Sequence, residues 1–286
     1  MLIDLQLHSI NSDGYLNPTE VAELCHQRGL KVASLTDHNT VSGQEEFNRA
    51  CKQFKIKAIP GMELYVKLKN KHLNLLWYNF DIDNPELHKI LRETQNRRRS
   101  SARKVLEKLK KKGYMIDVDA VVDKHNHYMP INRVVDSFRN LNKKKIQQEF
   151  GRTHVTSTEI VKHYFRSSSK VRLHESYINI ERIFRLRKKV GGQLILCHPC
   201  KFHWIDRDIL KKLTKMGLDG VEVLSPHHSW NAISYLQALA DQYKLIMTGG
   251  SDFHLFERDK YFKIKSSWDY FTIDSKMLKD VSKIIN

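Results

Sequence analysis

The sequence predicts an α/β protein, a parallel βα barrel that carries one helical insertion. Short aliphatic runs that end in polar residues alternate with helical segments, and nearly every run ends in histidine, aspartate or glutamate. Barrel active sites lie at the carboxyl ends of the strands, so a closed barrel fits this distribution better than an open sheet. No glycine-rich phosphate motif follows the first run, which argues against a nucleotide-binding fold. Seven strands are expected, at residues 2–8, 32–35, 56–59, 73–80, 194–197, 220–224 and 245–248.

Helix signals separate these strands. Asn17-Pro18-Thr19-Glu20 combines a capping residue, an early proline and an acidic third position, and this helix is expected to stop at Gly29. Residues 42–45 (SGQE) indicate a capping box at the start of the next helix. Later helices are expected around residues 183–190, 209–216 and 232–243.

The alternation stops after Asp83. Asn84-Pro85 begins a long basic helix that is expected to reach about residue 112, and helical and irregular stretches follow. We therefore predict one domain over residues 1–286, with a helical insertion or cap at about 84–178.

The composition is that of a globular protein with a strong positive charge. Lys and Arg number 49 against 32 Asp and Glu, which gives a net charge of +17. This excess attracts polyanions, although lysine-rich, solvated helix faces explain it equally well. No signal peptide and no apolar run of about 18 residues is recognised, so no membrane association is expected. Four scattered cysteines give no disulfide framework, and a reducing cytoplasm is the expected location.

Candidate metal ligands stand at the expected strand ends. Residues two apart on a strand share a face, which places Gln6 beside His8 and Asp252 beside His254. Imidazole and carboxylate ligands suit manganese, iron or zinc, and several neighbouring ions suit phosphoryl hydrolysis by a metal-bound hydroxide. Each residue alone has an ordinary structural explanation, but their coincidence at strand ends favours a shared site. The predicted set is His8, Asp13, His38, Glu63, His198, Asp252 and His254.

Five motifs in this order resemble the PHP (polymerase and histidinol phosphatase) family. They are DLQLHS with SDG (residues 4–14), LTDHNT (35–40), PGME (60–63), CHP (197–199) and GSDFH (250–254). Their spacing is most similar to the stand-alone branch of nucleoside 3′,5′-bisphosphate phosphatases and 5′-to-3′ oligoribonucleases. The resemblance implies a distorted seven-stranded βα barrel and two or three divalent ions, manganese first, with zinc or iron as alternatives.

The resemblance also implies a ligand set for each ion. Gln6, His8, Glu63 and Asp252 would surround one ion, and Glu63 would bridge to a second that His198 also holds. Asp13, His38 and His254 would hold a third. The GRTH element (residues 151–154) implies that Arg152 and His154 contact the substrate phosphate, and a guanidinium suits that task. His228, after the sixth strand, is a further candidate for substrate contact or for a supporting role.

Two positions depart from the family pattern. Gln6 stands where the first motif normally has histidine, and Asn74 stands where the fourth strand normally has one. Both are kept as candidate ligands, because an amide oxygen can bind a hard ion, although less strongly than imidazole binds zinc or iron. His72 lies on the same strand face, so a shift of two residues would restore an imidazole.

We therefore expect a metal-dependent phosphatase or phosphodiesterase that acts on a nucleotide or on short 5′-phosphorylated RNA. Two alternatives remain open. One is a small-metabolite phosphatase of the histidinol-phosphatase type, and the other is a nucleic-acid-binding protein with weakened metal sites. The sequence names no protein partner.

Overall fold

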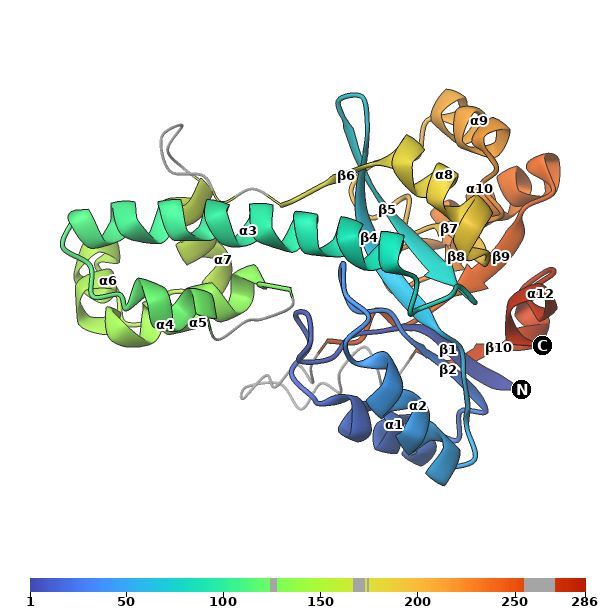
Figure 1. Ribbon diagram of the computed structural model, residues 1–286, viewed down its shortest axis with the longest axis horizontal. Coiled ribbons are helices and arrows are strands. Elements are labelled where there is room, and N and C mark those ends of the chain that lie inside the picture. The colour runs from blue at the N-terminus through green and yellow to red at the C-terminus, as the bar shows by residue number, and fades with distance from the viewer. Residues whose placement is uncertain (124–127, 167–172, 174, 255–270) are drawn as a thin grey trace. The chain divides into compact units, whose positions relative to one another are not determined.

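The computed structural model describes residues 1–123, 128–166, 173, 175–254 and 271–286. It contains two compact units. The first comprises residues 1–90 and 177–286, and the second comprises residues 91–176. The first unit is built on two β-sheets, and the described part of the second is helical, so the class is α/β (Figure 1).

The first sheet has four strands in the order β10-β1-β2-β3, and its three N-terminal strands run parallel. Helices α1 (Pro18–Gln27) and α2 (Gln44–Gln53) connect these strands and pack against each other on the same side (Figure 1). Apolar residues of both helices and of β1 and β2 form one buried cluster. The strands are β1 (Leu2–Leu7), β2 (Val32–Leu35), β3 (Lys57–Ala58) and β10 (Ile273–Asp274).

The second sheet has six strands in the order β6-β4-β5-β7-β8-β9. Strand β5 runs antiparallel to both neighbours, and the other pairs are parallel. The strands are β4 (Gly61–Leu68), β5 (Lys71–Tyr78), β6 (Ile178–Asn179), β7 (Gln193–Leu196), β8 (Gly220–Leu224) and β9 (Ile246–Gly249). The helices of this region are α8 (Ile180–Val190), α9 (Arg207–Met216), α10 (Trp230–Tyr243) and α12 (Ser282–Ile285), with the short helix η2 (Ser275–Met277).

The predicted α/β class is confirmed, but the closed ring of seven strands is not, because hydrogen bonding among the described residues forms two sheets of four and six strands. Two isolated parallel bridges join segments of the two sheets, Leu7 to Phe253 and His38 to Glu63. The sequence pattern missed β4, which pairs with β5 through the two-residue turn Lys69-Asn70. Lys69 adopts a positive φ of 51°, as a tight hairpin turn requires, but no glycine marks it.

The helix starts show one correct and one wrong prediction. Asn17 caps α1, and its side chain and that of Glu20 form the expected reciprocal capping box. The capping box predicted for α2 is wrong, because Gly43 occupies the capping position and no side chain caps the helix. A Cβ at Gly43 would lie 2.8 Å from Asn11 Nδ2, so this start is crowded against the first loop.

The second unit has its own apolar core, which includes Leu106, Val135, Phe138 and Phe165. Its helices are α3 (Pro85–Lys111, which begins in the first unit), α4 (Val118–Asp123), α5 (Ile131–Leu141), α6 (Lys143–Phe150), α7 (Ser157–Ile160) and the π-helix η1 (Val161–Arg166). Within the described ranges, no helix combines the length and apolar character that a bilayer crossing needs.

Candidate metal centre

The loop after β1 is held by Asp37, a residue that the sequence pattern did not single out. The Asp37 carboxylate accepts hydrogen bonds from Ser9 N (2.8 Å), Ser9 Oγ (2.6 Å) and Ser12 Oγ (2.5 Å). At Gly14 a Cβ would lie 2.4 Å from the carbonyl oxygen of His8, so only glycine permits this turn. Together these features fix the chain on both sides of Asp13.

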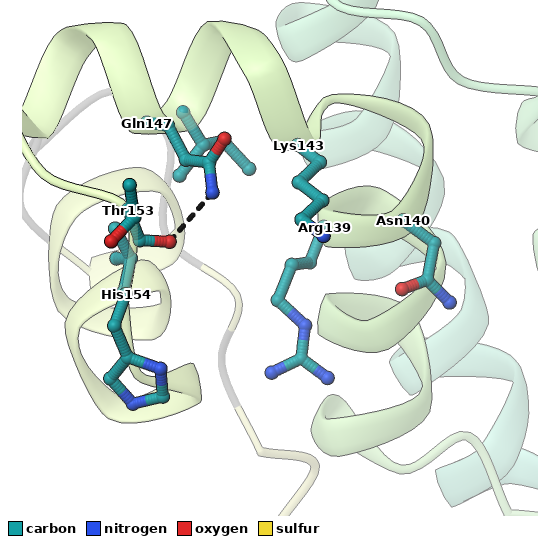
Figure 2. Close-up of a pocket in the computed structure, with 8 residues that line it drawn as sticks. Arg139, Asn140, Lys143, Gln147, Thr153 and His154 are labelled. Atoms are coloured by element: carbon teal, nitrogen blue, oxygen red, sulfur yellow. Dashed lines mark hydrogen bonds between the residues drawn. The ribbon is translucent and has the colours of Figure 1, made fainter.

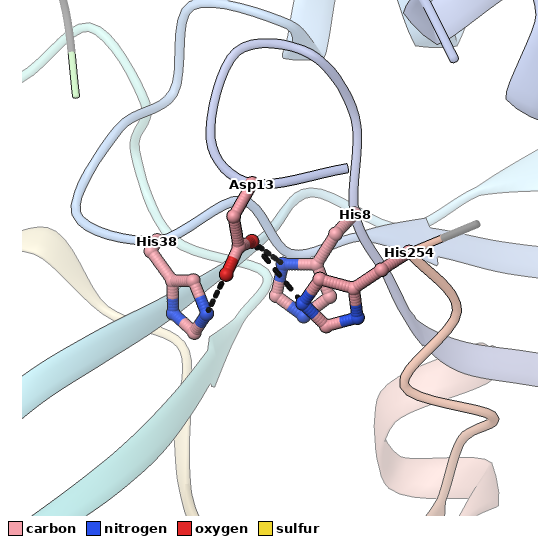
Figure 3. A group of neighbouring side chains, drawn as sticks. All are labelled: His8, Asp13, His38 and His254. Atoms are coloured by element: carbon pink, nitrogen blue, oxygen red, sulfur yellow. Dashed lines mark ion pairs between the residues drawn. The ribbon is translucent and has the colours of Figure 1, made fainter. Parts of the chain in front are cut away.

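Asp13 lies among three histidines, and His8, Asp13, His38 and His254 are called here the histidine cluster (Figure 3). His254 Nε2 is 3.1 Å from Asp13 Oδ1, and His38 Nε2 is 3.5 Å from Asp13 Oδ2. His8 Nδ1 is 3.8 Å from Asp13 Oδ1, and its ring stacks on that of His254 at 4.3 Å. The three residues expected to hold the third ion therefore lie together, and His8 lies beside them.

The charges of the histidine cluster are strongly coupled. Burial acts to raise the pKa of Asp13, but the adjacent His38 and His254 outweigh it and hold that pKa well below its usual value. Burial acts to lower the pKa of His8, yet hydrogen bonding to Asp252 and Glu63 raises it well above the ordinary value. The carboxylates and imidazoles here therefore stabilise each other's charged forms.

A second group surrounds Glu63, and Gln6, Glu63, Asn74 and His198 are called here the Glu63 cluster. Glu63 is fully buried and accepts hydrogen bonds from Gln6 Nε2 at 3.0 Å and from Asn74 Nδ2 at 2.5 Å. His198 Nε2 is 3.2 Å from Glu63 Oε1, and His8 Nε2 is 3.3 Å from Oε2. The amides of Gln6 and Asn74 therefore point their nitrogen atoms at the Glu63 carboxylate. As metal ligands they were expected to offer their oxygen atoms.

Asp252 connects the two clusters through His8, whose Nε2 is 3.1 Å from Asp252 Oδ1. Its other oxygen is 2.6 Å from His227 Nε2 and 3.3 Å from Lys201 Nζ. Asp252 and His198 both have positive φ, 51° and 25°. Neither residue is glycine, and such backbone strain is typical of functional sites.

Register explains why His72 does not replace Asn74. His72 pairs with Lys67 across the β4–β5 hairpin, and its ring stacks on Tyr177 at 3.9 Å. Asn74 pairs with Tyr65 and is the residue of β5 whose side chain reaches Glu63. The register is fixed by the two-residue hairpin turn, so the shift that would restore an imidazole does not occur.

The sequence pattern did not single out His227 and Glu222, which both lie near the site. The ring nitrogens of His228 face Val223 O (2.9 Å) and Cys200 N (3.4 Å), whereas its neighbour His227 faces Asp252. Glu222 is buried in the middle of β8 and accepts the His198 N–H at 2.7 Å. A site search limited to strand ends overlooks such a mid-strand carboxylate.

The GRTH element lies in the second unit. The Arg152 guanidinium forms an ion pair with Glu159. His154 lines a pocket of about 220 Å³ together with Arg139 and Lys143 (Figure 2). Both predicted substrate contacts therefore lie in a basic part of the insertion.

Comparison with known proteins gives the family. The PHP domain model matches residues 4–177, which is more than half of the chain. The chain belongs to the PHP domain family, and the predicted class of metal-dependent phosphoesterase is confirmed at that level.

Similar proteins match over most of their length. A 5′-3′ exoribonuclease of Haemophilus influenzae is 24% identical, over 88% of this chain and 89% of its own. A 3′,5′-nucleoside bisphosphate phosphatase of Chromobacterium violaceum is 25% identical, over 88% and 87%. A structure from Bifidobacterium adolescentis, described as that of a metal-dependent phosphoesterase, superposes on this chain with a TM-score of 0.76. The two sequences are 20% identical, and the match covers 88% of this chain and 87% of the other. That structural likeness concerns the fold.

Proposed function

We propose that this phosphoesterase hydrolyses a phosphate ester on a nucleotide, such as a 3′,5′-bisphosphonucleotide, or on short 5′-phosphorylated RNA. The observation that carries the proposal is the convergence of Asp13 with three imidazoles, beside the carboxylates Glu63 and Asp252. The named relatives support the substrate class, because one is a nucleoside bisphosphate phosphatase and another a 5′-3′ exoribonuclease.

Divalent ions fit this set of donors. Three overlapping groups bring ligand atoms within 4.8 Å of one another, which supports two or three ions. Imidazole nitrogens and carboxylate oxygens suit manganese, with zinc and iron as alternatives. When bound, such ions lower the pKa of a coordinated water and neutralise phosphate charge. The groups are His8, Asp13, His38 and His254; Glu63, Cys197 and His198; and His8, Glu63 and Asp252.

The protein's own residues orient this chemistry. His8 spans both clusters, with Nδ1 toward Asp13 and Nε2 toward Glu63 and Asp252, so this ring would help to hold ions at either cluster. Lys201 and His227 lie on the outer oxygen of Asp252, at 3.3 Å and 2.6 Å, and the Lys201 ammonium has further N–H donors that suit a phosphate oxygen. We propose His227, rather than His228, as the substrate contact at this point.

The proposed function is tested with metal analysis and two substrates. Purified protein is expected to contain divalent metal and to release phosphate, with manganese added, from a 3′,5′-bisphosphonucleotide or to shorten a 5′-phosphorylated oligoribonucleotide. Activity on histidinol phosphate alone would favour the small-metabolite alternative. Absence of metal and turnover, with RNA binding that weakens steeply as salt rises, would instead support the nucleic-acid-binding alternative.

The contribution of Arg152 is tested separately, because Glu159 competes with a substrate for the same guanidinium. Arg152→Ala is expected to raise KM roughly tenfold, in line with loss of a charged hydrogen bond worth about 1.5–3 kcal/mol, while metal content is unchanged. Glu159→Gln is the matched variant and is expected to keep or lower KM. An unchanged KM in Arg152→Ala would limit that residue to a structural ion pair.

A further inference from the structure

Cys197 lies directly against the Glu63 cluster. It follows β7, and its backbone N–H donates to the carbonyl oxygen of Asn74 at 3.0 Å. The residue is 2% exposed and forms no disulfide, and Gln6 Nε2 lies 3.2 Å from its Sγ. The thiol is therefore held at the position where the cluster has amides in place of the imidazoles expected at residues 6 and 74.

The geometry of Glu63, Cys197 and His198 suits a common ion. A carboxylate oxygen, the thiol sulfur and an imidazole nitrogen from these residues all lie within 4.8 Å of one another. Zinc bonds of about 2.0–2.3 Å to oxygen, nitrogen and sulfur place tetrahedral ligands roughly 3.3–3.8 Å apart. The contact of 3.2 Å between His198 Nε2 and Glu63 Oε1 is already close to that range.

Gln6 supplies a second, independent observation. Its side chain is fully buried, yet within the described residues its Oε1 has no hydrogen-bond partner. Rotation of the amide by 180° exchanges its nitrogen and oxygen, which directs Oε1 toward Glu63 and the Cys197 sulfur. In that orientation the oxygen would lie where Nε2 now contacts Glu63 and Cys197 Sγ, and it would be a fourth ligand to an ion held there.

Glu222 fixes the orientation of the same segment. Its carboxylate accepts the His198 N–H at 2.7 Å and lies 3.8 Å from Cys197 Sγ. The positive φ of His198 bends the chain at this point, so that the side chains of two consecutive residues both belong to the group around Glu63. Consecutive residues on a regular strand would point to opposite faces.

We propose that Cys197 is a metal ligand, and that its thiolate, Glu63 and His198 form a zinc-selective position beside the histidine cluster. The thiol proton passes to water when the ion binds. Thiolate is a soft ligand, so this position prefers zinc over manganese, whereas the histidine cluster offers only nitrogen and oxygen. The coordination itself does not depend on the substrate, but its role in phosphate hydrolysis rests on the proposed function.

The experiment uses cobalt(II) as the metal, because thiolate-bound cobalt gives a near-ultraviolet charge-transfer band. The full chain loaded with cobalt is expected to show this band, and Cys197→Ser is expected to lose it. Cys200→Ser, which removes the thiol three residues further along the chain, is the control and is expected to keep it. Equal loss in both variants would place the ion on the cysteine pair and would overturn the proposal.

A measurement on the unaltered protein covers the case in which Cys197→Ser fails to fold. X-ray absorption of the zinc-loaded chain is expected to show a sulfur neighbour at about 2.3 Å. A zinc environment of nitrogen and oxygen alone would overturn the thiolate proposal. If metal-dependent phosphate release persists in that case, the proposed function stands without it. A sulfur neighbour without phosphate release would support the ligand and contradict the function.

Discussion

The histidine cluster and the Glu63 cluster share His8 but differ in what surrounds their carboxylates. Asp13 lies among three imidazoles within 3.8 Å. Glu63 is contacted by two amide N–H groups in addition to imidazoles. A carboxylate among imidazoles offers a cation a full set of lone pairs, whereas amide donors already satisfy part of a carboxylate. We therefore expect a hard divalent ion to bind more tightly at the histidine cluster than at the Glu63 cluster.

The largest expected effect comes from removing the central carboxylate of the histidine cluster. Asp13→Ala is expected to lower phosphate release by about 10³-fold or more, because an ion at such a site supplies several kcal/mol of charge stabilisation. His254→Ala is expected to act in the same direction. Metal content and phosphate release are measured together in each variant. Unchanged release in both variants would place the active ion outside the histidine cluster.

The loop support should matter less than the ligands themselves. Asp37→Ala removes three hydrogen bonds that hold the loop carrying Asp13, and a 10- to 100-fold loss of metal affinity is expected. Asp37→Asn keeps an acceptor oxygen for the Ser9 N–H and should lose less. Metal titration by calorimetry compares the two variants. Equal affinity in Asp37→Ala and the wild type would show that the loop holds its shape without Asp37.

Restoring imidazoles is expected to reduce the difference between the two clusters. Gln6→His and Asn74→His each replace an amide N–H donor with a ring nitrogen, and zinc affinity should rise by about tenfold, since imidazole is the stronger ligand for zinc. Competition against a fluorescent chelator measures the change. The matched control is Asn79→His, on a side chain that donates to Gln193 Oε1 at 3.0 Å and to Ile284 O at 2.9 Å, outside both clusters. A similar rise in that control would indicate nonspecific binding by the added histidine.

The smallest effect on activity concerns the backbone beneath the Glu63 cluster, where the expected change is in stability instead. Asp4 accepts hydrogen bonds from the backbone N–H groups of Gln6 and Ser251, and burial raises its pKa from 3.8 to about 6. A raised carboxyl pKa means that the folded state binds the proton more tightly, so stability falls as pH rises from about 4 to about 6. Asp4→Asn keeps an acceptor without ionising.

Chemical denaturation at several pH values tests this expectation. The stability of Asp4→Asn relative to the wild type should increase between pH 4 and pH 7, by at most about 3 kcal/mol. A difference that is constant with pH would show that Asp4 does not titrate in this window. Asp4→Ala is the contrasting variant, since loss of the acceptor is expected to cost about 1–3 kcal/mol.

Local patterns predicted part of the fold well. The α1 capping box, the buried strand β2 and the strand β8 were placed correctly, because capping and hydrophobic runs are determined by adjacent residues. Strand β4 was missed, because a two-residue turn at Lys69-Asn70 lacks a glycine signal. The closed seven-stranded ring was not confirmed, since the described residues pair as sheets of four and six strands, and sheet closure depends on pairings between residues far apart in the sequence.

The sequence by itself determined the family, through its five motifs, and the α/β class, through its strand and helix pattern, and it supplied the candidate histidines and carboxylates. Only the tertiary structure decided how they divide. It placed His8 between the two clusters, turned the amide nitrogens of Gln6 and Asn74 toward Glu63, and brought the His227 ring against Asp252. Side-chain direction depends on strand register, backbone φ and neighbouring packing, which motif spacing does not specify. For the same reason, motif spacing did not point to Cys197 as a candidate ligand. Its sulfur lies near Glu63 and His198 at the point where the chain bends.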